Sequence, residues 1–226
     1  PAWAGGRAST SAPPAGACWN TSGCPMPGPM AAATTVRRCA PASSSTAAIP
    51  PGSLGLTLQP YWTPGLVHPG PEAKGAMIGF GAAHKKTHMY RALLEGLAYE
   101  MRSGRERIEA RTKVPVTDLV LCGGGSRSDL VMQITADVFG MPARRPSTDE
   151  ASGLGAAILG AVGAGLHPDV RAAATAMTGR GRVFQPIPDH VRRYEELYTR
   201  VYRPLYARLQ PLYRAIRQAT GYPPPP

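Results

Sequence analysis

The clearest periodic pattern of apolar residues lies in residues 189–219. Tyrosines, leucines and other apolar residues recur there three or four positions apart, and seven arginines lie among the other positions. This pattern predicts an amphipathic helix whose apolar side packs against its own domain. Pro204 and Pro211 lie inside it, and since each proline removes one backbone hydrogen bond, we expect a kinked helix or two shorter ones.

Three other segments also have a helical pattern. The longest runs from about residue 84 to residue 111, until Pro115 breaks it. Shorter patterns predict helices from about residue 128 to 139 and from 150 to 165. The last contains four glycines, and each interior glycine weakens a helix by roughly 0.5–1 kcal/mol relative to alanine. We therefore expect this helix to pack tightly against another backbone rather than to stand alone.

Short apolar runs predict the strands. They lie at residues 54–61, 75–80 and 116–122, and residues 142–145 form a short strand at best. The run at 116–122 is the strongest, because it is β-branched and apolar and is followed by glycines. Strands that alternate with helices predict an α/β domain over residues 53–226.

Residues 1–52 have a different composition from the rest of the chain. They contain no Leu, Phe, Tyr, Lys, Asp or Glu, and only two branched aliphatic residues. Such a segment cannot bury enough apolar area to offset its chain entropy, so we expect a low-complexity, disordered arm. A linker and a mistranslated or mispredicted segment are the alternatives. We expect its cysteines to be plain thiols, because their spacing suits zinc poorly; they are Cys18, Cys24 and Cys39.

Composition and charge exclude some classes of protein. No run of 18 or more apolar residues occurs, so a spanning helix is not expected, and four cysteines are too few for a disulfide-dense scaffold. Lys and Arg total 25 against 14 Asp and Glu, which gives a net charge of +11. This excess is spread along the chain without a block of five basic residues, so nucleic-acid and membrane partners are not expected. A non-catalytic basic binding or interaction module remains the alternative function.

A turn of three glycines between a predicted strand and a predicted helix is the strongest candidate for chemistry. Gly123, Gly124 and Gly125 let the backbone bend sharply and approach a ligand closely, and the next helix presents free N–H groups and a positive dipole end. These features suit a phosphate or the polar edge of a nucleoside. Ser126 or Ser128 could instead simply cap the helix. The pattern is neither a P-loop nor a dinucleotide fingerprint, since residue 128 is not glycine.

Two histidines one helical turn apart, His84 and His88, have a spacing that can bind zinc. No third ligand is apparent, and Lys85 and Lys86 would repel a cation. We therefore expect a solvated helix start here, and we assign no metal ligand.

Two acidic residues on the long predicted helix, Glu95 and Glu100, lie near Arg91 and Arg102. Oppositely charged residues three or four positions apart are neighbours on a helix surface. Ordinary pairing of this kind explains them without a catalytic role.

The order of the motifs is more specific than any one of them. Residues 74–80 and 90–100 come first, residues 122–130 with the three glycines follow, and residues 150–157 come last. In this order and at about this spacing the chain resembles the C-terminal half of the FGGY family of carbohydrate kinases. The resemblance covers roughly residues 54–226.

The resemblance implies a fold and an activity. The fold is the ribonuclease-H-like C-terminal domain of the actin/hexokinase/Hsp70-like ATPases, in which two domains face each other across a cleft. ATP lies on the C-terminal side and the sugar mainly on the N-terminal side, and a carboxylate acts as base on the sugar hydroxyl that attacks the γ-phosphate. ATP and Mg²⁺ are thus the implied cofactors, a sugar or polyol is the substrate, and the location is cytoplasmic.

The same resemblance assigns roles to residues of this chain. The backbone of Gly123, Gly124 and Gly125 would contact the adenosine and α-phosphate region, and Ser128 would lie near the base. The helix at residues 150–157 would pack behind this turn.

The resemblance does not supply every functional residue of the family. The family's base lies in the N-terminal domain, and its phosphate loop is not found in residues 1–52. We therefore expect a truncated kinase that lacks the catalytic base and does not transfer phosphate alone. Self-association is expected if the cleft face is exposed. Xylulose, ribulose, glycerol and other polyols all remain open as substrates.

Overall fold

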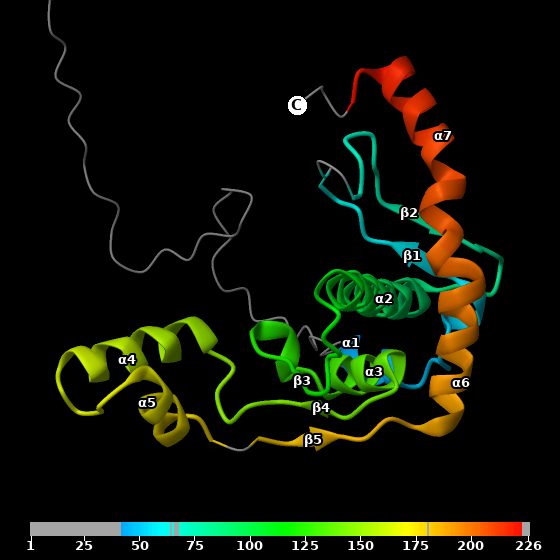
Figure 1. Ribbon diagram of the computed structural model, residues 1–226. Helices are drawn as coiled ribbons and strands as arrows, with labels where there is room; N and C mark the ends of the chain where they lie inside the picture. Colours follow the sequence, from blue (N-terminus) through cyan, green and yellow to red (C-terminus); the bar gives the residue numbers. More distant parts are fainter. Residues whose placement is uncertain (1–41, 64, 66–67, 180, 223–226) are drawn as a thin grey trace, which may run out of the picture. The chain divides into compact units, whose positions relative to one another are not determined.

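Helix α2 (Lys86–Thr112) is the longest helix of the described chain (Figure 1). The computed structural model describes residues 42–63, 65, 68–179 and 181–222. The helix begins where the ring Nδ1 of His88 accepts a hydrogen bond of 3.0 Å from the Lys85 N–H. It ends at Lys113, which adopts a left-handed conformation. The predicted helix at 84–111 is therefore confirmed to within two residues.

A two-stranded antiparallel sheet packs on α2. Strand β1 (Thr57–Gln59) pairs with β2 (Ala76–Ile78), inside the strands predicted at 54–61 and 75–80. Gly96 of α2 allows the close approach, because a Cβ atom there would lie 2.3 Å from the carbonyl oxygen of Leu58. The small core between β1 and α2 consists of Leu56, Leu58 and Ala92.

A three-stranded sheet precedes the tail. Strand β3 (Leu119–Val120) is parallel to β4 (Ala143–Arg144), which is antiparallel to β5 (Val183–Phe184). Helix α3 (Asp129–Phe139) connects β3 to β4, as the sequence predicted. It packs on the sheet through a core of Met132, Ala136, Ala143 and Phe184. The strong strand pattern at 116–122 yields only two strand residues, because β3 has one neighbour and Val120 is half exposed.

The tail forms α6 (Pro188–Leu197), a π-helical segment η3 (Tyr198–Tyr202) and α7 (Arg203–Thr220). Pro204 is the second residue after η3, and its ring nitrogen cannot donate to the preceding turn. Pro211 lies inside α7, which continues past it. The predicted interruption is thus a π-helical segment rather than a break at either proline.

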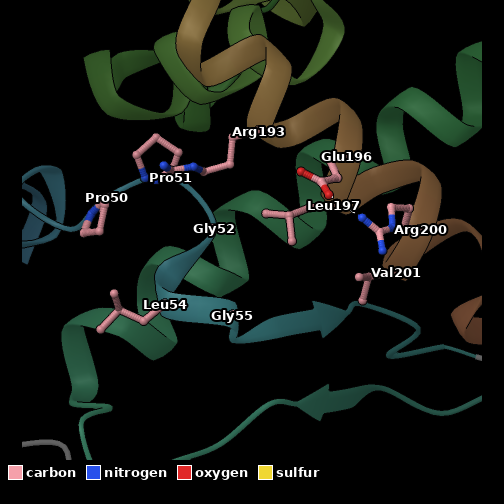
Figure 2. A pocket seen from close by; sticks show the side chains of 10 residues that line it. All are labelled: Pro50, Pro51, Gly52, Leu54, Gly55, Arg193, Glu196, Leu197, Arg200 and Val201. Carbon is pink, nitrogen blue, oxygen red and sulfur yellow. Dashed lines mark hydrogen bonds and ion pairs between the residues drawn. The ribbon is translucent and has the colours of Figure 1, made fainter.

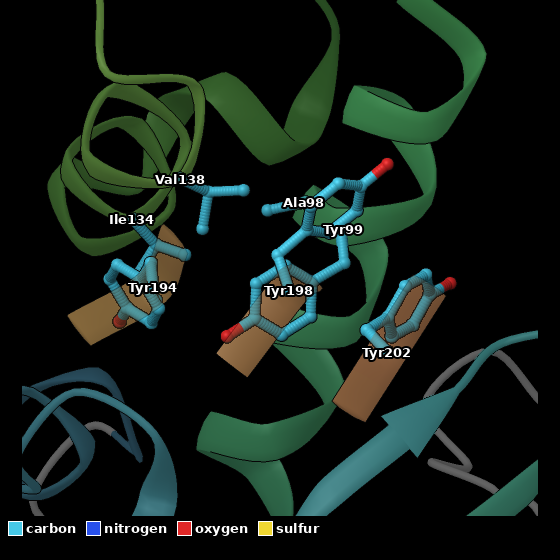
Figure 3. Packing of buried hydrophobic residues seen from close by; sticks show 7 residues of the cluster. All are labelled: Ala98, Tyr99, Ile134, Val138, Tyr194, Tyr198 and Tyr202. Atoms are coloured by element: carbon cyan, nitrogen blue, oxygen red, sulfur yellow. The ribbon is translucent and has the colours of Figure 1, made fainter. Parts of the chain in front are cut away.

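The main core lies where α6 and η3 meet α2 and α3. Figure 3 shows Tyr194, Tyr198 and Tyr202 of the tail facing Tyr99 of α2. The three tail tyrosines are four residues apart, and an α-helix with 3.6 residues per turn would rotate each one away from the last. The wider π-helical turn opposes this drift, so all three stay on the buried side.

The described part of the predicted arm is folded. Helix α1 (Ala42–Ala47) contacts α2, and a 3₁₀ turn η1 (Ser53–Gly55) leads into β1. The Thr46 side chain is fully buried. Residues 1–41, with the three cysteines of the arm, lie outside the described residues.

Helices α4 (Ala151–Gly163) and α5 (Val170–Met177) pack against each other. The prediction of helix α4 is confirmed, but the expectation that its glycines allow tight packing is wrong among the described residues. A Cβ atom placed at any of its four glycines meets no atom within 4 Å, at Gly153, Gly155, Gly160 or Gly163. No helix of the described residues is long and apolar enough to cross a membrane.

Candidate nucleotide site at the triple-glycine turn

The triple-glycine turn leads from β3 into α3. Gly123 has a φ of +84°, which favours glycine, and a 3₁₀ turn η2 (Gly124–Arg127) follows. The Gly123 N–H donates to the carbonyl of Asp149 at 2.9 Å, and the buried Ser126 hydroxyl donates to the Gly123 carbonyl at 2.8 Å. The turn is therefore fixed by its own Ser126 and by Asp149, which is distant in the sequence.

Ser128 caps helix α3. Its hydroxyl oxygen accepts a hydrogen bond of 3.4 Å from the Val131 N–H, in the position that serine favours before a helix. Of the two roles left open for the serines, capping is confirmed for Ser128, whereas Ser126 bonds within the turn. Ser128 also lies directly beside the glycine turn, because its N–H donates to the Gly125 carbonyl at 3.2 Å.

The outer side of the turn is open. A Cβ atom at Gly123, Gly124 or Gly125 would meet no described atom within 4 Å. Gly124 and Gly125 are exposed, and within the described chain neither N–H has a hydrogen-bond partner. A ligand can thus approach this backbone closely and find two free donors.

Ion pairs surround the turn. Arg127 bonds both Asp149 and, at 3.1 Å, Glu150, and the hydrogen bond from Arg127 holds the pKa of Asp149 below its usual value. Asp129 lies between Arg145, at 2.7 Å, and Arg182, and the hydrogen bond from Arg145 lowers its pKa too. Because these charges are already paired, the turn suits the uncharged part of a nucleotide better than a triphosphate.

The start of α4 lies beside the turn. Asp149 and Glu150 precede its first residue, Ala151, and reach Arg127 from there. This contact brings the segment at 150–157 next to the glycines, although the packing of its own glycines against the turn is not seen.

The other sequence candidates lie elsewhere. His88 is largely buried and serves as the cap of α2, and its ring centroid is 5.7 Å from that of His84. The expectation of a solvated helix start therefore holds for the exposed lysines but not for His88. Among the described residues, no group of three or more His, Cys, Asp or Glu could hold a metal ion.

Sequence reasoning missed a cavity that the folded chain forms away from the glycine turn. Its volume is about 530 Å³, and it lies between residues 50–55 and the tail segment from Arg193 to Val201. The triple-glycine turn does not line it. Nothing in the local sequence pattern brings two segments so far apart in the chain together, so only the folded chain reveals the cavity.

Comparison with known proteins identifies the family. Residues 28–164 match the C-terminal domain of the FGGY family of carbohydrate kinases. The chain is 36% identical over 158 residues to the uncharacterized sugar kinase YgcE of Escherichia coli (strain K12). The aligned region covers 70% of this chain and 32% of the relative. It is 41% identical over 147 residues to a ribulokinase of Mycolicibacterium smegmatis, covering 63% of this chain and 26% of the relative.

Solved structures give the same result. Xylulose kinase from Rhodospirillum rubrum has a TM-score of 0.64 and 30% identity to this chain, with 76% of this chain and 34% of that structure covered. The chain thus spans about a third of the length of the relatives it matches. The actin/hexokinase-like ATPase fold that the resemblance implied is therefore confirmed. The chain belongs to the FGGY family of carbohydrate kinases and matches its C-terminal domain.

Proposed function

We propose that this chain forms the nucleotide side of an ATP-dependent kinase that phosphorylates a sugar or polyol hydroxyl. Membership of the FGGY family supports the general class. The observation that supports the location of the nucleotide is the open backbone of Gly124 and Gly125, with two unpartnered N–H groups on a rigidly held turn. A cytoplasmic location, where ATP is at hand, belongs to the same proposal.

The three glycines contact the adenosine and α-phosphate region through their backbone. Gly124 and Gly125 have no side chain that would keep a ligand away, and their N–H groups can donate to it. Ser128 lies near the purine base of the nucleotide, and the helix that it caps directs its N-terminus toward the turn. Arg127 and Asp149 form an ion pair beside the turn, so neither of them presents an unpaired charge to the bound nucleoside.

ATP supplies the γ-phosphate, and the residues of this chain bind and orient its nucleoside end. Mg²⁺ is proposed with ATP, but the described residues offer no acidic cluster for it, so no ligand is assigned. The base carboxylate belongs, by family resemblance, to the other domain. Relatives named as xylulose kinase, ribulokinase and glycerol kinase keep the substrate class at sugars and polyols.

The proposal is tested by a matched pair of glycine substitutions. Gly124→Val places a side chain on the open edge of the turn, where the fold has room for it, and should weaken ATP binding at least tenfold. Gly160→Val, farther along α4, also points into open space and should leave ATP binding unchanged. The measurement is the thermal shift with ATP and Mg²⁺, since a ligand at 100 times its Kd stabilises a protein by about 2.7 kcal/mol. Equal shifts in both variants would place the nucleotide elsewhere.

A further inference from the structure

A cavity of about 530 Å³ lies apart from the triple-glycine turn (Figure 2). One wall comes from the segment before β1, including Pro51 and Leu54. The other comes from α6 and η3, including Arg193 and Leu197. The volume falls within the range of about 300–1,000 Å³ that is usual for small-molecule sites.

The first wall is a backbone in an uncommon conformation. The φ angles of Gly52, Ser53, Leu54 and Gly55 are +87°, +47°, +56° and +90°. For serine and leucine this region is unfavourable, and such residues persist only when their surroundings hold them. The Gly52 N–H donates to buried Glu95 at 3.0 Å, which fixes the start of this turn. As a consequence Leu54 lines the cavity with 54% of its surface exposed, rather than entering the core.

The second wall carries an unbalanced positive charge. Arg200 and Glu196 pair with each other at 2.5 Å, so their charges cancel. Arg193 has no hydrogen-bond or ion-pair partner among the residues that the structure describes. Figure 2 shows its side chain reaching toward Pro51, which lines the same cavity. Apolar surface from Leu197 and Val201 lies along the same wall.

Most of the backbone N–H groups of the first wall are already bonded. Those of Gly52, Ser53 and Gly55 donate to Glu95, to the Pro50 carbonyl and to the Gly52 carbonyl, which leaves only the Leu54 N–H without a partner among the described residues. The charge that can pair with a negative group is therefore that of Arg193, whereas Pro51, Leu54 and Leu197 offer surface to an apolar body.

We propose that this cavity binds a small organic anion, with its carboxylate or phosphate paired to Arg193 and its apolar body against Leu54 and Leu197. The site goes beyond the proposed kinase function and shares no residue with the triple-glycine turn. Binding at the cavity can therefore be tested with substitutions that do not touch the triple-glycine turn.

The test uses two fluorescent probes on the full 226-residue chain. The first, 8-anilinonaphthalene-1-sulfonate, joins an anion to an apolar body, and N-phenyl-1-naphthylamine lacks the anion. Arg193→Gln should weaken the anionic probe about tenfold and leave the neutral probe within twofold. Arg192→Gln is the matched control, because Arg192 pairs with Asp189 and does not line the cavity. Equal weakening in both variants would show diffuse charge attraction and overturn the proposal.

A second variant separates binding from folding. Leu54→Asn removes one apolar side chain from the first wall, and asparagine tolerates a positive φ better than leucine, so the fold should survive. Both probes should then bind at least fivefold more weakly, while the ATP thermal shift stays as in the unchanged chain. Probe binding that Leu54→Asn leaves intact would overturn the proposal.

Displacement experiments distinguish the sources of the anion. Octanoate and hexyl phosphate compare a carboxylate with a phosphate on an apolar body, and inorganic phosphate carries the charge alone. The proposal expects one of the amphipathic anions to displace the probe at least tenfold better than inorganic phosphate. Equal displacement by all three would contradict the role of the apolar wall.

Discussion

Glu95 shows how one buried residue joins distant parts of the chain. Its carboxylate is 2% exposed and accepts hydrogen bonds from the Gly52 N–H at 3.0 Å, from Arg91 at 2.8 Å and from the Tyr194 hydroxyl at 2.7 Å. Arg91 also donates to the Tyr194 oxygen at 2.8 Å. Burial, and then the Glu95 charge, raise the pKa of Tyr194 far above its usual value, so this hydroxyl remains a donor.

Removing this carboxylate should be costly. Glu95→Ala leaves Arg91 buried without its counter-charge, and breaking a buried pair in this way typically costs about 3–5 kcal/mol. Glu196→Ala removes an exposed partner of Arg200 and should cost under about 1 kcal/mol. The free energy of unfolding in urea measures both. Similar losses in the two variants would contradict the structural role given to Glu95.

At the residue scale, the sequence predicts local partners but not distant ones. The pairing of Arg91 with Glu95 one turn apart is confirmed, yet its burial depends on Tyr194, which is 99 residues from Glu95. Glu100 differs from the expectation of ordinary pairing with a neighbour: it accepts from Tyr61 and Tyr202, and it pairs with Arg107 seven residues along α2.

The candidate site follows the same rule. The glycines and the cap at Ser128 can be read from adjacent residues, and the cap is confirmed. The pairing of Arg127 with Asp149 joins residues 22 positions apart, which no local pattern encodes. The nucleotide contacts of the turn stay a prediction.

At the scale of elements, the same substitution in two helices should have opposite effects. Gly160→Ala in α4 adds a Cβ in open space, so it should stabilise the protein by about 0.5–1 kcal/mol. Gly96→Ala in α2 places a Cβ 2.3 Å from the Leu58 carbonyl oxygen, and such overpacking typically costs about 1–3 kcal/mol. Thermal unfolding of the two variants measures the difference. Destabilisation by Gly160→Ala would show that α4 is packed after all.

A row of tyrosine hydroxyls fastens the tail to the rest of the chain. Tyr198 donates to Glu106 at 2.9 Å, Tyr202 to Glu100 at 3.0 Å, and Tyr213 of α7 to Gln59 of β1 at 2.8 Å. The π-helical segment keeps the first two hydroxyls on the side that faces α2. Each bond requires a protonated tyrosine, which makes the attachment of the tail sensitive to alkaline pH.

Burial raises the pKa of Tyr198 and of Tyr213 to about 12 in the folded chain. The unfolded pKa of tyrosine is about 10. The folded chain therefore holds more protons between pH 10 and 12, so this stabilisation is fully present below pH 10 and is lost as pH rises toward 12. Tyr198→Phe should make the alkaline fall in unfolding free energy less steep. The half-exposed Tyr90 provides the control, and Tyr90→Phe with the same effect would contradict this account.

The elements themselves were predicted unevenly. Helices α2, α3 and α4 follow from periodicity within each segment, and so does the amphipathic tail. Strands depend on their neighbours, and β5 was missed because its two residues form a strand only through pairing with β4. Helix α5 was missed as well, although Asp169 carries a capping signal, since its carboxylate accepts a hydrogen bond of 2.8 Å from the Ala172 N–H.

At the scale of the whole molecule, the chain covers about a third of the length of its relatives. The proposed function assigns nucleotide binding to this chain and the catalytic base to the other domain of the family. The 226-residue chain should respond to ATP in the thermal shift, yet release no ADP when it is offered xylulose, ribulose or glycerol. A coupled ADP-release assay checks this expectation. Turnover near about 1 s⁻¹, which is ordinary for kinases, would contradict it.

The bond between Gln59 and Tyr213 joins residues 154 positions apart. On the ribosome, β1 would emerge long before its partner in the tail, and Glu95 would precede Tyr194 by 99 residues. Contacts with so large a sequence separation slow folding, and the early segments expose apolar and charged surface while they wait. A nascent chain that stalls before residue 194 would therefore be a natural client for chaperones.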